Sequence, residues 1–239
     1  MREPIRLDKR CVELFACSRG AAVKYIQGGW VRVDGEVEER PQFKVQDQKI
    51  ELLEGASLDP IKPVTLIFNV PEGFASDDAT TIQKLITPES HSKEDYSGVK
   101  ILNKHFHDLK PASFLQKGAS GLMVFSKDYN VLRVLLDNNI KKEEEYIIEF
   151  SDEYTPEALE QLNELAYGSD KSHPQYKVSK QNETRMRFVT KYAQPDQIET
   201  LCKRVGLKTV AIKRIRIGKV SMKDLPPGEW RYLADNTMF

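Results

Sequence analysis

The chain has 239 residues and a mass of 27.4 kDa, enough for one core of ordinary size plus a small second module. Hydrophobic residues make up 40% and the mean hydropathy is −0.51, which excludes wholesale disorder, and no run reaches the roughly 18 apolar residues of a membrane span. Basic and acidic residues number 36 each, no apolar leader follows Met1, and the three cysteines form neither an even disulfide set nor a metal-ligand pattern. We therefore expect a soluble, cytoplasmic protein without a metal site.

The neutral total charge hides a segregated distribution. Residues 1–33 hold seven bases and three acids, residues 203–223 hold eight bases and no acid, and residues 143–170 hold ten acids and no base. Two basic segments can bind a polyanion even in a neutral chain, whereas two solvated surfaces would show the same pattern. Charge alone leaves both interpretations open.

The N-terminal segment predicts a small module of two helices and short strands. Residues 5–27 have helical spacing with a break before Ser18, which is a natural N-cap for the second helix. The pair Asp34-Gly35 is typical of a hairpin turn, and residues 45–53 read as a closing strand. We predict a domain over residues 1–55, followed by a linker at 56–62.

Residues 63–239 predict a larger α+β domain with a mixed or antiparallel sheet. The expected elements in chain order are strands at 64–70 and 121–126, a helix at 128–138, a strand at 146–150, a helix at 156–167, strands at 176–180 and 185–192, a helix at 195–205 and a long strand at 208–217. The polar stretch 75–100 has loop-like composition, and we expect it to contribute little to the core.

Three motifs of the first module carry a family resemblance. They are Arg6-Leu7-Asp8-Lys9, then Ser18-Arg19 with Ala22, then Gly28-Gly29-Trp30-Val31-Arg32-Val33-Asp34-Gly35. This order resembles the S-four RNA-binding domain, in which two short helices and a turn present Lys and Arg to phosphates. The resemblance implies RNA contacts from Arg6, Lys9, Ser18, Arg19, Lys24 and Arg32. Ala21 stands where the family often has Glu, so a capping box is missing.

The larger domain contains ordered motif segments at 67–73, 111–122, 144–146, 195–201, 214–217 and 225–231. In this order they resemble the catalytic domain of the bacterial RsuA/RluF-type ribosomal RNA pseudouridine synthases. Pseudouridine formation breaks the bond from ribose to the uracil nitrogen, turns the base and rejoins it through carbon. The family implies an aspartate nucleophile, a tyrosine that stacks on the flipped base and an arginine that pairs with the aspartate. No cofactor is implied.

The residues at these motif positions depart from the family pattern. Gln116 stands at the aspartate position, and an amide is a poor nucleophile. Asp196 stands at the arginine position, whereas Tyr146 keeps the tyrosine position. The family's lysine before that tyrosine is Glu144, while structural residues such as Trp230 are intact. This combination predicts a catalytically impaired member of the family.

Other candidate groups carry weaker signals. Asp108 and Asp128 are carboxylates near the Gln116 motif, but neither falls at the nucleophile position. His105 and His107 form an H-x-H pair without a third ligand, which does not favour a metal site. Cys202 lies on an apolar helical face and is expected in the core.

Three function classes remain open at this point. The first is a non-catalytic protein that binds ribosomal RNA or a ribosome precursor through the S-four residues, joined by Lys213, Arg214 and Arg216. The second is an active pseudouridine synthase that uses another nucleophile. The third is a protein-interaction module whose acidic stretch 143–170 binds a basic partner. We favour the first.

Overall fold

The computed structural model describes residues 3–74, 78–137, 139–140, 142–167, 175–191, 196–234 and 239. The chain divides into two compact units: unit 1 comprises Met1–Pro63 with Lys100–Asp108, and unit 2 comprises Val64–Val99 with Leu109–Phe239. The module predicted for residues 1–55 thus gains a segment from the middle of the chain. None of the helices in the described part of the chain is long and apolar enough to cross a membrane.

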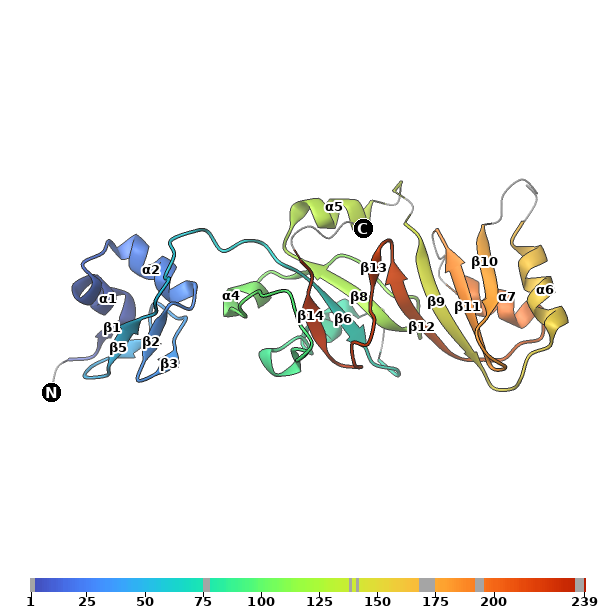
Figure 1. Ribbon diagram of the computed structural model, residues 1–239, viewed down its shortest axis with the longest axis horizontal. Helices are drawn as coiled ribbons and strands as arrows, with labels where there is room; N and C mark the ends of the chain where they lie inside the picture. The colour runs from blue at the N-terminus through green and yellow to red at the C-terminus, as the bar shows by residue number, and fades with distance from the viewer. Residues whose placement is uncertain are drawn as a thin grey trace. The chain divides into compact units, whose positions relative to one another are not determined.

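Unit 1 packs two short helices against short strands, as the hydrophobic spacing predicts. Its elements are β1 (Ile5–Arg6), α1 (Leu7–Phe15), α2 (Arg19–Gln27), β2 (Val31–Val33), β3 (Glu36–Val37), β4 (Lys44–Val45), β5 (Ile50–Leu52) and α4 (Asn103–Phe106) (Figure 1). Leu7, Cys11, Ala22 and Ile26 point into one core from the two helices. The Ser18 side chain accepts a 3.1 Å hydrogen bond from the amide of Ala21, which confirms the predicted N-cap.

The segment Lys100–Asp108 packs onto the S-four-like module through specific contacts. The ammonium group of Lys100 lies 4.8 Å from the ring centroid of Trp30 and also contacts the carbonyl oxygen of Gly29. The amide of Asn103 donates a 2.7 Å hydrogen bond to the carboxylate of Glu39. These contacts join residues about 70 positions apart in the chain, a separation that local patterns cannot reveal.

Unit 2 is built on one mixed sheet. Its strands are β6 (Thr65–Val70), β7 (Lys110–Pro111), β8 (Ser120–Ser126), β9 (Glu144–Phe150), β10 (Tyr176–Lys180), β11 (Arg185–Thr190), β12 (Thr209–Ile217), β13 (Val220–Ser221) and β14 (Trp230–Tyr232). The strand order is β10-β11-β9-β12-β8-β6-β14, with β13 on β12 and β7 on β8. The β8–β12 pair is parallel, and the other pairs are antiparallel. The predicted α+β class is confirmed.

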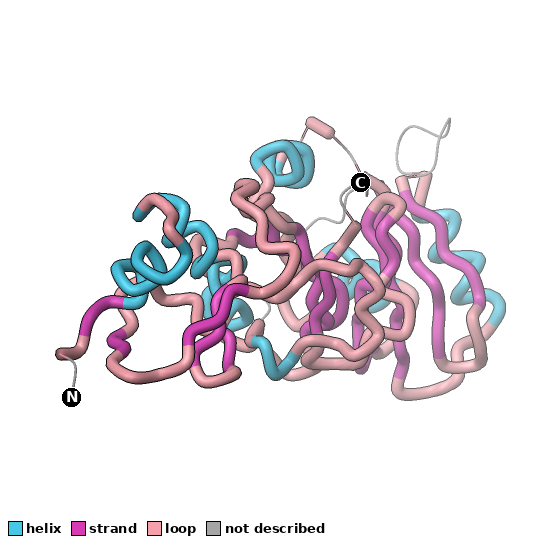
Figure 2. The backbone as a smooth tube through the Cα atoms, turned by 60° about the vertical axis from the view of Figure 1, so that its left-hand side comes forward, coloured by secondary structure: helices cyan, strands magenta, loops and turns pink. Residues whose placement is uncertain are grey.

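Helices cover different halves of the two sheet faces (Figures 1 and 2). The helices of unit 2 are α3 (Ala79–Gln83), the single 3-10 turn Pro88–Ser90, α5 (Tyr129–Leu136), α6 (Pro156–Leu165) and α7 (Gln197–Arg204). The α6 and α7 helices pack on Tyr146, Ile148 and Phe150 of β9. The α5 helix packs on residues of β8 and β6 that point to the other face, such as Val124 and Ile67.

Several sequence predictions need correction in detail. The strand expected at 45–53 is interrupted, because residues between Val45 and Ile50 form bends and leave β4 and β5 in different sheets. The polar stretch 75–100 does contribute to the core, since Ile82 and Ile86 are buried there. The other long elements lie where the periodicity predicts them. Cys202 is buried as expected. The predicted bounds at Asn138, Tyr192 and Pro195 lie outside the described residues.

Candidate functional site

The centre of the sheet aligns three residues from three strands. Arg214 of β12 pairs with Gly121 of β8 on one side and with Tyr146 of β9 on the other. Paired residues point to the same face of a sheet, so Arg214 and Tyr146 share one face. Gly121 has a φ of +97°, and a Cβ there would lie 2.3 Å from the carbonyl oxygen of Arg214. Only glycine allows β8 and β12 to approach this closely.

Arg214 is buried and is bonded to the loop that precedes β8. Its Nε donates to the carbonyl of Leu122 at 2.9 Å, and its Nη1 donates to the carbonyl of Phe114 at 2.7 Å. Its Nη2 donates to the hydroxyl of Ser113 at 3.1 Å. One guanidinium therefore holds both ends of the segment that contains Gln116.

Glu144 links the tyrosine and the arginine. The hydroxyl of Tyr146 donates a 2.5 Å hydrogen bond to one carboxylate oxygen of Glu144, and Nη1 of Arg214 lies 3.4 Å from the other. Burial raises the pKa of Tyr146 well above its ordinary value. The positive charge of Arg214 opposes this rise in pKa, whereas the negative charge of Glu144 adds to it. The phenol is therefore neutral at physiological pH, and it serves as a hydrogen-bond donor rather than as a base.

Gln116 and Asp196 lie in different surroundings. Gln116 is buried in the loop that Arg214 holds, and its backbone carbonyl accepts a 3.0 Å hydrogen bond from the backbone amide of Ala119. Asp196 is exposed at the N-cap of α7, where its φ of 57° is left-handed and its side chain makes no capping hydrogen bond. The structure thus brings Tyr146 and Arg214 together in one contact network, with Gln116 in the adjoining loop. It shows no contact of Asp196 with this network among the described residues.

The carboxylates considered as substitutes for an aspartate at position 116 do not join this network. Asp128 caps α5 by accepting a 2.8 Å hydrogen bond from the amide of Asn130. Asp108 belongs to unit 1. Among the described residues, Glu144 is the carboxylate that contacts both Tyr146 and Arg214. Sequence reasoning noted Glu144 only as a lost lysine, because its bridging position depends on strand pairing.

The proposed surface role of Arg214 is wrong, because its guanidinium is 2% exposed and is committed to the interior of the sheet. Arg216 is half-buried and donates to the carboxylates of Glu143 and Glu145. Lys213 is half-buried on the same strand. The acidic stretch is likewise not a uniformly solvated face, since Glu145 is buried and bonded to two arginines.

A buried carboxylate organises the basic residues of unit 1. Asp8 is 1% exposed and accepts two hydrogen bonds from Arg6, at 3.0 and 2.9 Å, and one from Arg19 at 3.3 Å. The hydrogen bond from Arg6 contributes most to holding the pKa of Asp8 below its ordinary value, and Arg19 contributes further. The two arginines are thereby fixed side by side at the starts of α1 and α2, with Arg19 68% exposed.

Further cations of unit 1 point to solvent. Lys9, Lys24 and Arg32 are exposed. Lys100 adds a cation that sequence analysis missed. Its partial burial lowers its pKa, the nearby charge of Glu39 opposes this shift, and the charge of Arg32 reinforces it. Lys100 was missed because it lies outside the predicted module in sequence. Unit 1 thus presents several cations, of which Asp8 holds two in place, and such cations can bind the phosphates of a nucleic-acid backbone.

Comparisons with known proteins agree with both units. Residues 5–49 match the model of the S4 domain, the S-four domain of the sequence resemblance. An "uncharacterized RNA pseudouridine synthase" of Aquifex aeolicus is 28% identical over 97% of this chain and 93% of its own length. The dual-specificity RNA pseudouridine synthase RluF of Escherichia coli K12 is 26% identical over 98% of this chain and 77% of its own length. The ribosomal small subunit pseudouridine synthase A of Vibrio parahaemolyticus is 25% identical over 96% of both chains.

The chain is thus similar to RsuA/RluF-type pseudouridine synthases over nearly its whole length. Its fold is similar as well: a crystal structure of pseudouridylate synthase superposes with a TM-score of 0.54, covering 96% of each chain at 20% identity. The family pattern predicts the nucleophilic carboxylate at the position of Gln116, in the loop that Arg214 holds.

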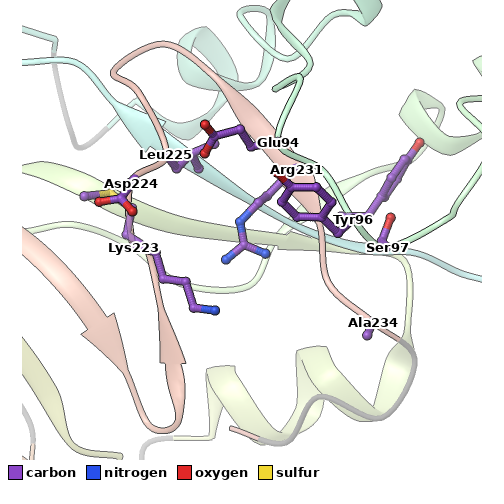
Figure 3. A pocket seen from close by; sticks show the side chains of 10 residues that line it. Glu94, Tyr96, Ser97, Lys223, Asp224, Leu225, Arg231 and Ala234 are labelled. Atoms are coloured by element: carbon purple, nitrogen blue, oxygen red, sulfur yellow. The ribbon is translucent and has the colours of Figure 1, made fainter.

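A hollow lies on the face of the sheet opposite Tyr146 and Arg214. Arg231 pairs with Ile67 of β6 and shares its face, which is the one that α5 covers. Figure 3 shows Arg231 and Lys223 among the side chains that line this hollow, whose volume is about 340 Å³. Glu94 and Asp224 also line it, so its four formal charges cancel. Among the described residues, no group of three or more His, Cys, Asp or Glu is placed to hold a metal ion.

Proposed function

We propose that this protein binds ribosomal RNA or a ribosome precursor and does not convert uridine to pseudouridine. The observation that carries the proposal is the neutral amide of Gln116 in the loop held by Arg214. An aspartate nucleophile stores the intermediate covalently, and an amide cannot do so. Removal of a covalent nucleophile costs about 10⁴- to 10⁶-fold in rate.

The support for RNA binding is independent of the catalytic centre. It consists of the S4 match, the arginines that Asp8 holds at the helix starts, and the relatives whose names state that they act on RNA. Fixed cations bind phosphates at a lower entropic cost than mobile side chains do. The name of one relative, a ribosomal small subunit pseudouridine synthase, supports the choice of ribosomal RNA as the target.

The decisive experiment maps pseudouridine in ribosomal RNA that has been treated with the purified protein, beside RNA treated with an active relative. We expect no new pseudouridine, together with RNA binding that weakens as salt rises. Binding through about five phosphates weakens with a log–log slope near −4, because each contact releases condensed counterions. A new pseudouridine would contradict the loss of activity, and the absence of salt-sensitive binding would contradict the RNA-binding role.

One observation favours a second candidate, an active synthase with another nucleophile. The carboxylate of Glu144 contacts both Tyr146 and Arg214, which is the kind of neighbourhood that the family gives its aspartate. Should the mapping detect pseudouridine, Glu144→Gln tests this candidate directly. Loss of that product in Glu144→Gln would identify Glu144 as the nucleophile, and its persistence would exclude Glu144.

Restoring the family aspartate alone should not restore turnover. In Gln116→Asp the new carboxylate has no arginine at position 196, where this chain has Asp196, and Tyr146 remains hydrogen-bonded to Glu144. We expect no pseudouridine above background in the same mapping assay. Detectable product from this single variant would show that the arginine position is dispensable in this chain.

The acidic stretch 143–170 as a docking site for a basic protein stays a prediction. Two of its first residues, Glu144 and Glu145, already form ion pairs with arginines of the unit 2 sheet. We propose RNA as the principal partner and assign no partner protein to this stretch.

A further inference from the structure

The strands β10, β11, β9 and β12 leave one face uncovered by helices. The α6 and α7 helices pack on the face that carries Tyr146, and Figure 1 shows them on the far side of these strands, with no helix over the near side in the described part of the chain. Because successive side chains of a strand point to opposite faces, every second residue of these strands points to the near side. We call this near side the open face.

Strand pairing arranges the open face into rows that cross four strands. One row contains Ser179, Arg187, Ile147 and Lys213, which pair successively from β10 to β12. The next row contains Lys177, Val189, Glu145 and Arg216. Cations thus recur across the sheet at neighbouring positions, and they do not lie along a single strand.

Cations outnumber anions on the open face. The basic residues on it or at its strand ends are Lys177, Arg185, Arg187, Lys191, Lys213 and Arg216. The acidic residues are Glu143, Glu145 and Glu149. Six positive and three negative charges leave an excess of positive charge in a chain whose total is zero. Such local excess attracts a polyanion.

A buried carboxylate holds the two central arginines in place. Glu145 is 4% exposed, accepts a 2.7 Å hydrogen bond from Nε of Arg216 and also contacts Nε of Arg187. No hydrogen bond recorded among the described residues uses the Nη atoms of Arg187. Glu145 therefore orients the guanidinium of Arg187 through its Nε, and the Nη atoms remain available to a ligand.

A hollow of about 380 Å³ opens beside this arginine. It is lined by Arg187, Lys177, Lys191 and hydroxyl-bearing Ser179 and Thr190, with Arg216 and Glu143 at the β12 side. Phosphate groups are recognised by guanidinium forks, ammonium groups and hydroxyls of this kind. Tyr176, the aromatic residue among the described residues that line the hollow, is buried, so it offers no exposed ring for stacking with bases.

We propose that the open face is a second RNA-binding surface, which contacts backbone phosphates without reading bases and seats one phosphate in the hollow beside Arg187. The choice of RNA as the polyanion rests on the proposed function. The surface lies on the side of the sheet opposite Tyr146 and Arg214, so it is separate from the candidate catalytic centre. It binds a different stretch of RNA from the one that reaches that centre.

The test uses the full chain and a fluorescein-labelled hairpin of ribosomal RNA. The double variant Lys177→Glu/Lys191→Glu reverses the charge of two exposed lysines that line the hollow. It leaves Glu145 and the two arginines bonded to it unchanged. We expect about a tenfold loss of affinity and a log–log salt slope shallower by about 2. The matched control is Lys180→Glu/Lys203→Glu, which makes the same charge change on β10 and α7 at lysines that do not line the hollow.

The possible outcomes separate this proposal from the proposed function. If the open-face variant binds like the control while reversal of Arg19 and Arg32 weakens binding, the open face is not an RNA surface and the RNA-binding function stands. If neither pair of reversals weakens binding, both proposals fail. If the open-face variant keeps its RNA affinity but loses binding to a poly-glutamate peptide, the face serves an acidic protein and the RNA proposal is overturned.

Discussion

Replacing Arg214 with methionine is expected to destabilise unit 2 by about 3–5 kcal/mol, the usual cost of removing one partner from a buried charged network. Methionine preserves much of the side-chain length but donates no hydrogen bond. The carbonyls of Phe114 and Leu122 lose their bonds to the guanidinium, and Glu144 loses the facing cation. The midpoint of thermal unfolding should fall by roughly 10 °C, which calorimetry or circular dichroism would measure.

A matched control separates burial from the loss of a positive charge. Arg133 is exposed on α5, so Arg133→Met should change the free energy of unfolding by less than about 0.5 kcal/mol. Equal melting temperatures for the Arg214 and Arg133 variants would show that the guanidinium of Arg214 does not hold the loop of Gln116. The account of that loop as a pinned segment would then be wrong.

Reversing two charges of unit 1 should produce the largest effect on RNA binding. In Arg19→Glu/Arg32→Glu both exposed cations become anions, and we expect about a 100-fold loss of affinity and a salt slope shallower by about 2. The fold should survive, because Asp8 keeps its two hydrogen bonds from Arg6, position 19 is exposed at the helix start, where the dipole favours an acid, and position 32 is exposed on β2. Fluorescence anisotropy over a range of salt concentrations measures both quantities.

The control for this prediction carries the same change in total charge elsewhere. Lys84 and Lys203 are exposed residues of unit 2, and Lys84→Glu/Lys203→Glu should reduce affinity far less. If the two double variants bind RNA equally, the contact surface is not the S4 module. A melting curve for each variant establishes that the comparison is between folded proteins.

Local sequence patterns determined much of the secondary structure. Helical spacing and the Ser18 cap predicted α1 and α2, and apolar runs predicted β6, β8, β9 and β12 within a few residues. Ordered motifs also predicted the family. These features depend on side-chain period and on capping chemistry within one turn or strand, so they can be read without knowing what packs against them. The interruption between β4 and β5 falls at Gln46-Asp47-Gln48-Lys49, and the strand predicted across it disregarded this polar, turn-favouring composition.

Tertiary structure alone decided which residues meet. Arg214 was predicted to contact RNA together with Lys213 and Arg216, yet its pairing with Gly121 and Tyr146 places its side chain in the interior. Glu144 became part of the candidate centre, and Lys100 joined unit 1, through contacts between residues about 70 positions apart. The sequence by itself determined the fold class and the resemblance to RsuA/RluF-type pseudouridine synthases, and it places Gln116 where that resemblance implies an aspartate. The network around that position depended on strand register, because register sets which side chains share a face and is specified by long-range packing.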